Sequence, residues 1–192
     1  MKLRAFLAFE IPDVVRRAVA TLMHDLRQYS GEDVKWTAPE HMHVTMRFFG
    51  SVEASLLNGE IATRVARLAA RYGPLTLDCS GVGVFPNWKY PRVIWVGFAG
   101  PTESLLHLHD ELNHACAGLP IAADERQFRL HLTVARAGRS ALRAALVKRV
   151  ESLGPVQFGA VPVAQLTLYK SQLTKSGSVY TPLQTFNFQP KE

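Results

Sequence analysis

The stretch HVTMRFFG at residues 43–50 predicts a β-strand with three polar side chains on one face. From Val44 onward apolar residues alternate with polar ones, as in a strand with one buried face. The opposite face then carries His43, Thr45 and Arg47, which supply an imidazole, a hydroxyl and a guanidinium. All three groups can bind phosphate, although Arg47 has the alternative of a solvated position on the rim of the strand.

A second strand-like stretch, HLTVAR, repeats the His-x-Thr spacing with His131 and Thr133. A single His-x-Thr is common by chance. Here, however, the interval from Arg4 to His43 equals the interval from Arg92 to His131. Because each motif follows a strand and a helix at the same distance, the sequence predicts an internal repeat that depends on element order and spacing.

Apolar periodicity and turn residues place the remaining elements. In the first half we predict strands at 3–9, 43–50 and 75–85 and helices at 13–30 and 52–72, with Ser51 as the N-cap of the second helix. In the second half we predict strands at 92–98, 131–136, 163–171 and 178–188 and helices at 102–116 and 140–152.

These elements predict an α+β fold with a single bilobal domain over residues 1–192. Two similar antiparallel sheets, with helices on their outer faces, would face each other across a central cleft. A pseudo-twofold axis would then bring His43 and His131 to opposite sides of one site. No linker rich in serine or glycine separates the halves, so we expect one compact unit, and we expect it to be a monomer.

Composition narrows the class of protein. Of the 192 residues, 47% are hydrophobic and 20% are charged, which is typical of a soluble globular protein. Glu10 and Pro12 end the first apolar run too early for a secretion signal, and no apolar run is long enough for a membrane span. Only two cysteines occur, without a CxxC spacing, so a disulfide framework or thiolate zinc site is not expected. We expect a cytoplasmic protein.

The chain is basic, with a net charge of +6 and a pI of about 9.6. This balance suits a polyanionic partner such as nucleic acid, which basic proteins attract through steering and counterion release. A basic protein without such a partner is an equally open alternative. Charge alone does not separate RNA from DNA, or either of them from a small phosphate ester.

Two imidazoles that face each other suit a reaction with one general acid and one general base near neutral pH. Thr45 and Thr133 point to the same side as their histidines, so their hydroxyls can donate to non-bridging phosphate oxygens. No carboxylate cluster accompanies either motif, which argues against two-metal chemistry. The residues therefore predict metal-free hydrolysis of a phosphoester, without a cofactor.

Histidine pairs leave zinc as an alternative, since His41 lies near His43 and His107 near His109. The second pair falls in a predicted helix, where side chains two residues apart diverge, so we predict no metal site. The histidines of the predicted helices are expected on helix surfaces; they are His24, His107, His109 and His114.

HVTMRF and HLTVAR resemble the paired H-x-T-x-x-F and H-x-T-x-x-R motifs of the two-histidine phosphoesterases. The stretches RAFLAFEIP, KWTAPEHMHVTMRFFG, FRLHLTVARAG and LYKSQLTKSGSVYTPL are similar to one branch, the RNA 2′,3′-cyclic phosphodiesterases, also called bacterial 2′–5′ RNA ligases. The resemblance covers nearly the whole chain. It implies an enzyme that opens the 2′,3′-cyclic phosphate at an RNA end and leaves a 2′-phosphomonoester.

The resemblance also implies a role for each motif residue. His43 would protonate the departing ribose O3′ as general acid, and His131 would activate the attacking water as general base. The two halves are so alike that the residues themselves give no way to choose between these two assignments.

The remaining motif residues would bind the substrate. The resemblance implies that Thr45 and Thr133 hold phosphate oxygens and that Arg136 grips the phosphate bidentately. It also implies that Phe48 stacks on the nucleobase.

Strict strand alternation conflicts with two of these roles. Phe48 and Arg136 lie five residues after their histidines, which puts them on the opposite face of a regular strand. A bulge or strand end near 47–48 and 135–136 is required to turn them back, and a glycine follows each strand closely. Without the resemblance, Phe48 would be predicted to lie in the core.

Other functions stay open on the residues alone. The aromatic and basic segment FPNWKYPR, at residues 85–92, is a candidate contact for an RNA strand. A non-catalytic RNA-binding module would keep its RNA affinity after loss of both histidines. A phosphodiesterase for a small cyclic nucleotide, or for ADP-ribose cyclic phosphate, would need the same scaffold and would be identified by a substrate panel.

Overall fold

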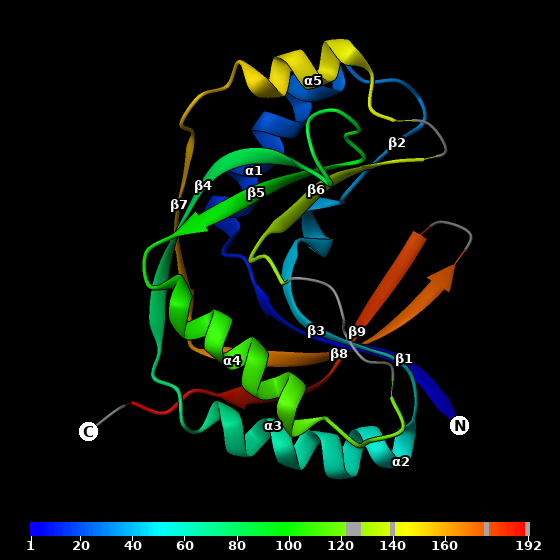
Figure 1. Ribbon diagram of the computed structural model, residues 1–192, viewed down its shortest axis with the longest axis vertical. Coiled ribbons are helices and arrows are strands. Elements are labelled where there is room, and N and C mark those ends of the chain that lie inside the picture. Colours follow the sequence, from blue (N-terminus) through cyan, green and yellow to red (C-terminus); the bar gives the residue numbers. More distant parts are fainter. Residues whose placement is uncertain (122–127, 139–140, 175–176, 191–192) are drawn as a thin grey trace.

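The computed structural model describes residues 1–121, 128–138, 141–174 and 177–190. They form two antiparallel sheets, sheet A with strand order β3-β1-β8-β9 and sheet B with order β2-β6-β5-β4-β7 (Figure 1). The elements are β1 (Lys2–Glu10), α1 (Asp13–Arg27), β2 (Val34–Trp36), a 3₁₀ turn (Pro39–His41), β3 (His43–Glu53), α2 (Ala54–Leu56), a π-helical turn (Leu57–Ile61), α3 (Ala62–Ala69), β4 (Leu75–Phe85), β5 (Val93–Ala99), α4 (Thr102–Ala115), β6 (Leu132–Ala137), α5 (Ala144–Glu151), β7 (Gln157–Val163), β8 (Gln165–Thr174) and β9 (Gly177–Asn187).

The predicted α+β class with two antiparallel sheets is confirmed. The internal repeat is also present, but its two halves are combined in a way that the sequence did not predict. The orders β3-β1-β8-β9 and β6-β5-β4-β7 correspond strand for strand. In sheet A, β1 of the first half pairs with β8 of the second, while in sheet B β5 of the second half pairs with β4 of the first. The halves thus exchange strands, and neither half completes a sheet without the other.

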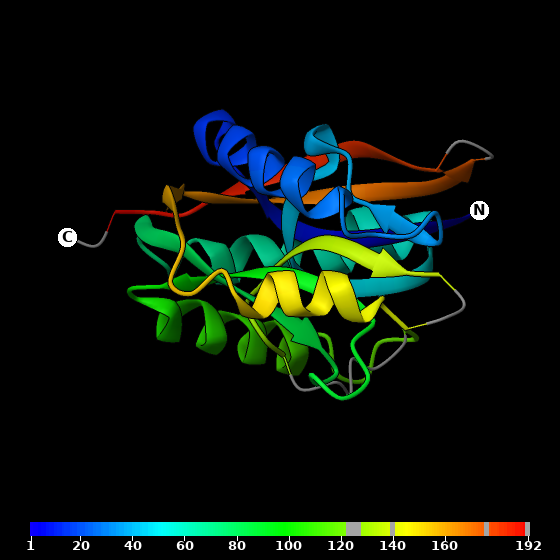
Figure 2. The ribbon, with the colours of Figure 1, turned by 90° about the horizontal axis from the view of Figure 1, so that it is seen from above.

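Helices pack on both sheets. α1 contacts β7 and α5, whereas α4 contacts α3 and β3, and α3 also contacts β9. In Figure 1, α5 lies at the upper end of the molecule and α3 at the lower end, and Figure 2 shows the same elements from above. Strands β3 and β6 are themselves in contact, so the two strands with the His-x-Thr motifs meet at the junction of the sheets.

Helix α1 packs on the core with an apolar side of helical spacing. α1 buries Val15, Val19, Met23 and Leu26, which recur at helical intervals and join the main core. Burial of side chains of this size contributes about 1.5–3 kcal/mol each, which exceeds what helix propensity alone supplies.

Three predicted boundaries are corrected. Ser51 is not an N-cap, because it pairs with Arg4 of β1 and the strand runs on to Glu53. The predicted strand at 163–171 corresponds to β8, which begins at Gln165 in sheet A, whereas Val163 is the last residue of β7 in sheet B, a strand that was not predicted. The last helix begins at Ala144, and residue 140, its predicted start, lies outside the described residues.

Candidate active site

The two motifs have the same pattern of burial along the chain. From His43 and from His131 alike, the next five residues alternate and then break the alternation: half-buried, buried, half-buried, buried, buried, exposed. The pattern ends on Phe48 in β3 and on Arg136 in β6, and both side chains are exposed. Two consecutive buried residues in a strand indicate an irregularity in the pairing with the neighbouring strand.

A β-bulge is present in β3. Leu7 of β1 pairs with Arg47 and Ala8 pairs with Thr45, so Met46 has no opposite residue. One extra residue in a strand reverses the side to which all following side chains point.

The corresponding bulge is present in β6. Ile94 of β5 pairs with Ala135 and Trp95 pairs with Thr133, so Val134 is the extra residue. The two bulges occupy the same position relative to their histidines, close to the place at which the sequence required them.

The bulges return Phe48 and Arg136 to the faces of their histidines. Phe6 of β1 lies between His43 and Phe48, with ring centroids 4.8 Å and 5.8 Å away. In β6, Nη2 of Arg136 donates to Oγ1 of Thr133 over 3.3 Å. Each motif thus presents its histidine, its threonine and its last residue, Phe48 or Arg136, on one surface.

The bulge in β3 turns Arg47 away from this surface. Both predictions for Arg47, a phosphate contact beside His43 and a solvated position on the rim of the strand, are therefore wrong. Arg47 is only 3% exposed, and its guanidinium carbon lies 5.8 Å from the centre of the Phe49 ring. The guanidinium also contacts the thiol of Cys116 at the end of α4 and lowers the pKa of that thiol, although burial outweighs it and raises the pKa overall.

Both motif histidines have one ring nitrogen fixed by the backbone. Nδ1 of His43 lies 2.7 Å from the carbonyl oxygen of His41, and Nδ1 of His131 lies 2.6 Å from that of Arg129. A carbonyl oxygen only accepts, so Nδ1 carries the hydrogen in each ring and donates it. In the neutral ring, Nε2 is then the atom with a lone pair for proton transfer.

The surroundings of His43 are aromatic. Phe6 stacks on it at an interplanar angle of 27°, and Tyr180 of β9 approaches edge-on with ring centroids 5.1 Å apart. Burial lowers the pKa of His43 to about 4, and a smaller repulsion from His41 acts in the same direction, while the backbone hydrogen bond opposes both. At neutral pH the His43 imidazole is therefore uncharged in the free protein.

The surroundings of His131 combine one aromatic ring with cations. Phe85, the last residue of β4, approaches His131 edge-on at 4.9 Å between ring centroids. Arg129 lies over the Phe85 ring at 5.7 Å, and Arg136 extends from β6 on the side of Thr133. These groups make this half of the site suited to an anion such as a phosphate.

The aromatic residues around the histidines were missed by the sequence analysis. Phe6 and Tyr180 read as ordinary strand residues, and Phe85 was predicted as the end of a strand and the start of a candidate RNA contact, not as a neighbour of His131. Tyr169 of β8 and Phe85 of β4 occupy equivalent places in the two sheets, because Tyr169 pairs with Phe6 and Phe85 pairs with Val93. Pairing between distant strands is not encoded in any local pattern, so no sequence signal placed these rings beside the histidines.

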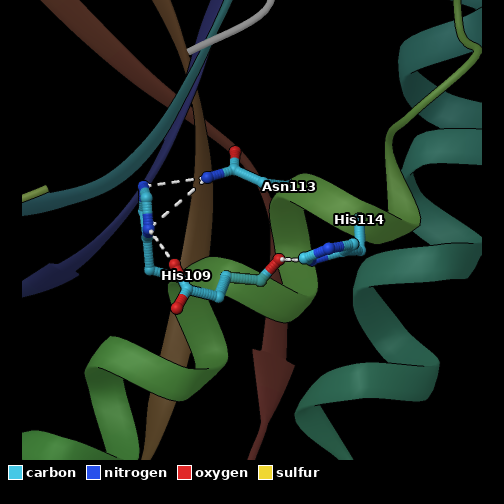
Figure 3. A network of polar contacts seen from close by, with 4 residues as sticks. His109, Asn113 and His114 are labelled. Atoms are coloured by element: carbon cyan, nitrogen blue, oxygen red, sulfur yellow. Dashed lines mark hydrogen bonds and ion pairs between the residues drawn. The ribbon is translucent and has the colours of Figure 1, made fainter. Parts of the chain in front are cut away.

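His109 corrects the prediction that all helix histidines lie on the surface. It is 3% exposed and its ring stacks on Phe128 with centroids 3.9 Å apart. Figure 3 shows the side chains of His109 and Asn113 turned toward each other on α4, with 3.3 Å between His109 Nε2 and Asn113 Nδ2. His114 instead donates from Nδ1 to the carbonyl oxygen of Asp110, over 2.8 Å.

Among the described residues, no group of three or more His, Cys, Asp or Glu side chains is arranged to hold a metal ion. Within the same residues, no helix is both long and apolar enough to cross a membrane.

Comparison with known proteins gives one family. The model of the 2′-5′ RNA ligase superfamily matches residues 12–174. The chain is 33% identical to the RNA 2′,3′-cyclic phosphodiesterase of Methanothermobacter thermautotrophicus over 186 residues. The aligned region covers 97% of this chain and 99% of that protein. The chain is 32% identical over 184 residues to the protein of the same name from Archaeoglobus fulgidus, covering 96% and 99%.

The fold is also that of a solved structure. The crystal structure of TT0787 of Thermus thermophilus superposes with a TM-score of 0.82 at 28% identity, covering 99% of this chain and 100% of that one.

Proposed function

The chain belongs to the 2′-5′ RNA ligase superfamily, and from this premise we propose that it hydrolyses RNA 2′,3′-cyclic phosphate ends to 2′-phosphomonoester ends. The enzyme class comes from the relatives, whose names describe this activity. Their sequences are about one-third identical to this chain over nearly its whole length. The observation that carries the proposal within this chain is the matched geometry of the two motifs. Each histidine has Nδ1 tied to a backbone carbonyl, and each stands on a surface with a threonine hydroxyl.

The reaction requires two proton transfers, one from the attacking water and one to the leaving ribose O3′. His131 accepts a proton at Nε2 from the water that attacks phosphorus, and a new P–O bond forms. His43 donates a proton from Nε2 to ribose O3′ as the P–O3′ bond breaks, which leaves the phosphate on O2′. Both steps use the ring nitrogen that the backbone hydrogen bond leaves available.

The pKa of His43 sets a condition for this assignment. A general acid must be protonated, and burial holds the pKa of His43 at about 4 in the free protein. An anionic phosphate beside the ring raises that pKa, because the opposite charge favours the imidazolium form. Substrate binding therefore charges His43, and the proton is taken up together with the cyclic phosphate.

The other motif residues bind the cyclic phosphate and its nucleoside. Thr45 and Thr133 donate their hydroxyl hydrogens to the non-bridging oxygens, where charge develops during the reaction. Arg136 supplies two parallel N–H donors, which a planar guanidinium can direct at two oxygens of one phosphate. Phe48 is 39% exposed on the same surface as His43, and it stacks on the terminal base.

We further propose that the reaction requires neither metal nor cofactor, and that the protein acts as a cytoplasmic monomer. The proposal of a reaction without metal or cofactor rests on imidazole acid–base chemistry, which supplies a base and an acid without a Lewis acid.

The test is incubation of an oligoribonucleotide ending in 2′,3′-cyclic phosphate with the protein and excess EDTA. The expected result is conversion to a 2′-phosphate end, identified by resistance of the product to a 3′-specific phosphatase and by its mass. Activity that EDTA abolishes and one divalent cation restores contradicts the metal-free proposal. RNA binding without turnover, unchanged in a His43→Ala, His131→Ala double variant, identifies a binding module instead.

A further inference from the structure

The loop between β4 and β5, residues 86–92, displays two aromatic rings to solvent. Trp88 is 44% exposed and Tyr90 is 61% exposed, and both are large apolar side chains outside the core. Lys89 stands between them in the chain, with its Nζ atom 5.4 Å from the centre of the Tyr90 ring. We call residues 86–92 the β4–β5 loop.

The conformation of the β4–β5 loop is stabilised by hydrogen bonds within the loop and at its base. Oδ1 of Asn87 accepts from the backbone N–H groups of Lys89 and Tyr90, both over 3.0 Å. At the base of the loop, the N–H of Arg92 donates to the carbonyl oxygen of Phe85 over 2.7 Å. These hydrogen bonds reduce the conformational entropy that the loop backbone loses when a ligand binds to Trp88 and Tyr90.

The loop is joined to the half of the candidate site that contains His131. Phe85, where the loop leaves β4, is the residue whose ring contacts His131. The carbonyl oxygen of Arg92, where the loop ends, accepts a hydrogen bond from the N–H of Ala137, and Nη2 of Arg92 donates to the carbonyl oxygen of Gly138. The two ends of the loop that carries the exposed rings are therefore attached to His131 and to the end of β6, the strand of Arg136.

Exposed aromatic rings beside cations, on a loop of fixed shape, are the features with which proteins bind single-stranded nucleic acid. Bases stack on the rings, and Lys and Arg side chains neutralise the phosphates between them. The net charge of +6 also favours a polyanionic partner. The position beside the site fits an RNA strand whose end is already bound there.

We propose that the β4–β5 loop binds the nucleotides that precede the cyclic phosphate, with Trp88 and Tyr90 stacking on bases and Lys89 paired with a phosphate. This inference rests on the proposed function and specifies its substrate: the enzyme prefers an oligoribonucleotide with a cyclic end to a cyclic mononucleotide. A mononucleotide has no preceding residue, so it does not reach the loop.

The test compares the two substrates in a Trp88→Ala, Tyr90→Ala double variant. Loss of one stacked base raises the KM for the oligoribonucleotide about tenfold or more. The kcat for the oligoribonucleotide and the kcat/KM for a 2′,3′-cyclic mononucleotide stay at wild-type values. The Trp88→Phe, Tyr90→Phe variant, which keeps a ring at both positions, restores most of the affinity for the oligoribonucleotide.

Tyr29 supplies the matched control, because it is 39% exposed and lies 6.0 Å from the guanidinium of Arg149, outside the loop and both motif strands. Tyr29→Ala is expected to leave both substrates unaffected. An unchanged KM for the oligoribonucleotide in the double variant, or an equal loss on both substrates, overturns the role of the loop.

A binding measurement separates this inference from the proposed function. Fluorescence anisotropy of a labelled oligoribonucleotide with a 2′-phosphate end reports RNA affinity whether or not the protein turns over. Weaker binding by the double variant, with no hydrolysis by the wild type, supports the loop and contradicts the phosphodiesterase proposal. Equal binding by both proteins contradicts the loop whatever the activity.

Discussion

Tyr180 approaches His43 edge-on, with ring centroids 5.1 Å apart and an angle of 90° between the rings, although the two residues lie on opposite edges of sheet A. Phe6, on the strand next to β3, closes the stacked side of the same imidazole. These rings keep water from His43, and burial lowers its pKa from 6.5 to about 4. The depressed pKa has consequences for both stability and catalysis.

The first prediction concerns stability and pH. A group whose pKa is lower in the folded state contributes stability above its unfolded pKa, and that contribution is lost as pH falls toward the folded value. For His43 the window runs from about 6.5 down to about 4, and the full loss is about 3 kcal/mol. Urea unfolding at a series of pH values checks it, with His43→Gln as the control that removes this dependence. If the free energy of unfolding depends on pH in the same way for the two proteins, His43 is not a buried, neutral imidazole.

A second prediction tests the cause of that pKa. Tyr180→Ala admits water to the edge of His43, so the pKa of His43 rises toward 6.5, as followed by NMR titration of its ring protons. Addition of a 2′-phosphomonoester raises the pKa of His43 in the wild type as well, because the anion favours the charged ring. Leu183→Ala, which removes another partly exposed side chain of β9, is expected to leave the titration unchanged.

The third prediction concerns Arg136. Arg136→Lys keeps the charge but loses the bidentate fork, so kcat/KM falls at least about tenfold. Arg67→Lys, on the exposed side of α3, makes the same chemical change away from the motifs and leaves kcat/KM unaltered. Wild-type kinetics in Arg136→Lys would assign Arg136 to a structural or long-range electrostatic role.

A fourth prediction concerns Arg47, which is buried with Nε and Nη1 lacking hydrogen-bond partners in the structure as far as it is described. A buried, poorly paired charge destabilises a fold, so Arg47→Met is expected to be neutral or to stabilise by about 1–4 kcal/mol. Thermal unfolding measures the change, and kcat/KM stays at the wild-type value because Arg47 points away from His43. A large loss of activity with the fold intact would return Arg47 to the site.

The side-by-side placement of most residues of the candidate site could be predicted from the sequence because the signals are local. His43 and Thr45, two residues apart in a strand, must share a face, and the same holds for His131 and Thr133. The positions of Phe48 and Arg136 required bulges that strict alternation forbids, and only the resemblance pointed to them. The pairings of β1 with β3 and of β5 with β6 supply those bulges.

What the sequence did not predict depends on contacts between distant segments. Arg47 was placed beside His43 because periodicity alone gives no sign of the bulge at Met46. The burial of His109 depends on its packing against Phe128, which precedes β6. Tyr180 reaches His43 only because β8 and β9 join sheet A, an exchange between halves that repeat spacing does not reveal.

The last prediction assigns the roles of the two histidines. Each member of an acid–base pair contributes about 10²–10⁴-fold, so His43→Ala and His131→Ala are both expected to fold normally and to be nearly inactive. A substrate with sulfur in place of the bridging O3′ has a leaving group that needs no proton. If His43 is the acid, this substrate restores activity to His43→Ala and not to His131→Ala. With the wild type, the ratio of kcat/KM for the oxygen substrate to kcat/KM for the thio substrate then falls as pH rises above about 4, because only the oxygen substrate needs protonated His43. Rescue of His131→Ala instead exchanges the roles, and the low pKa of His43 then describes a base that is already neutral before substrate binds.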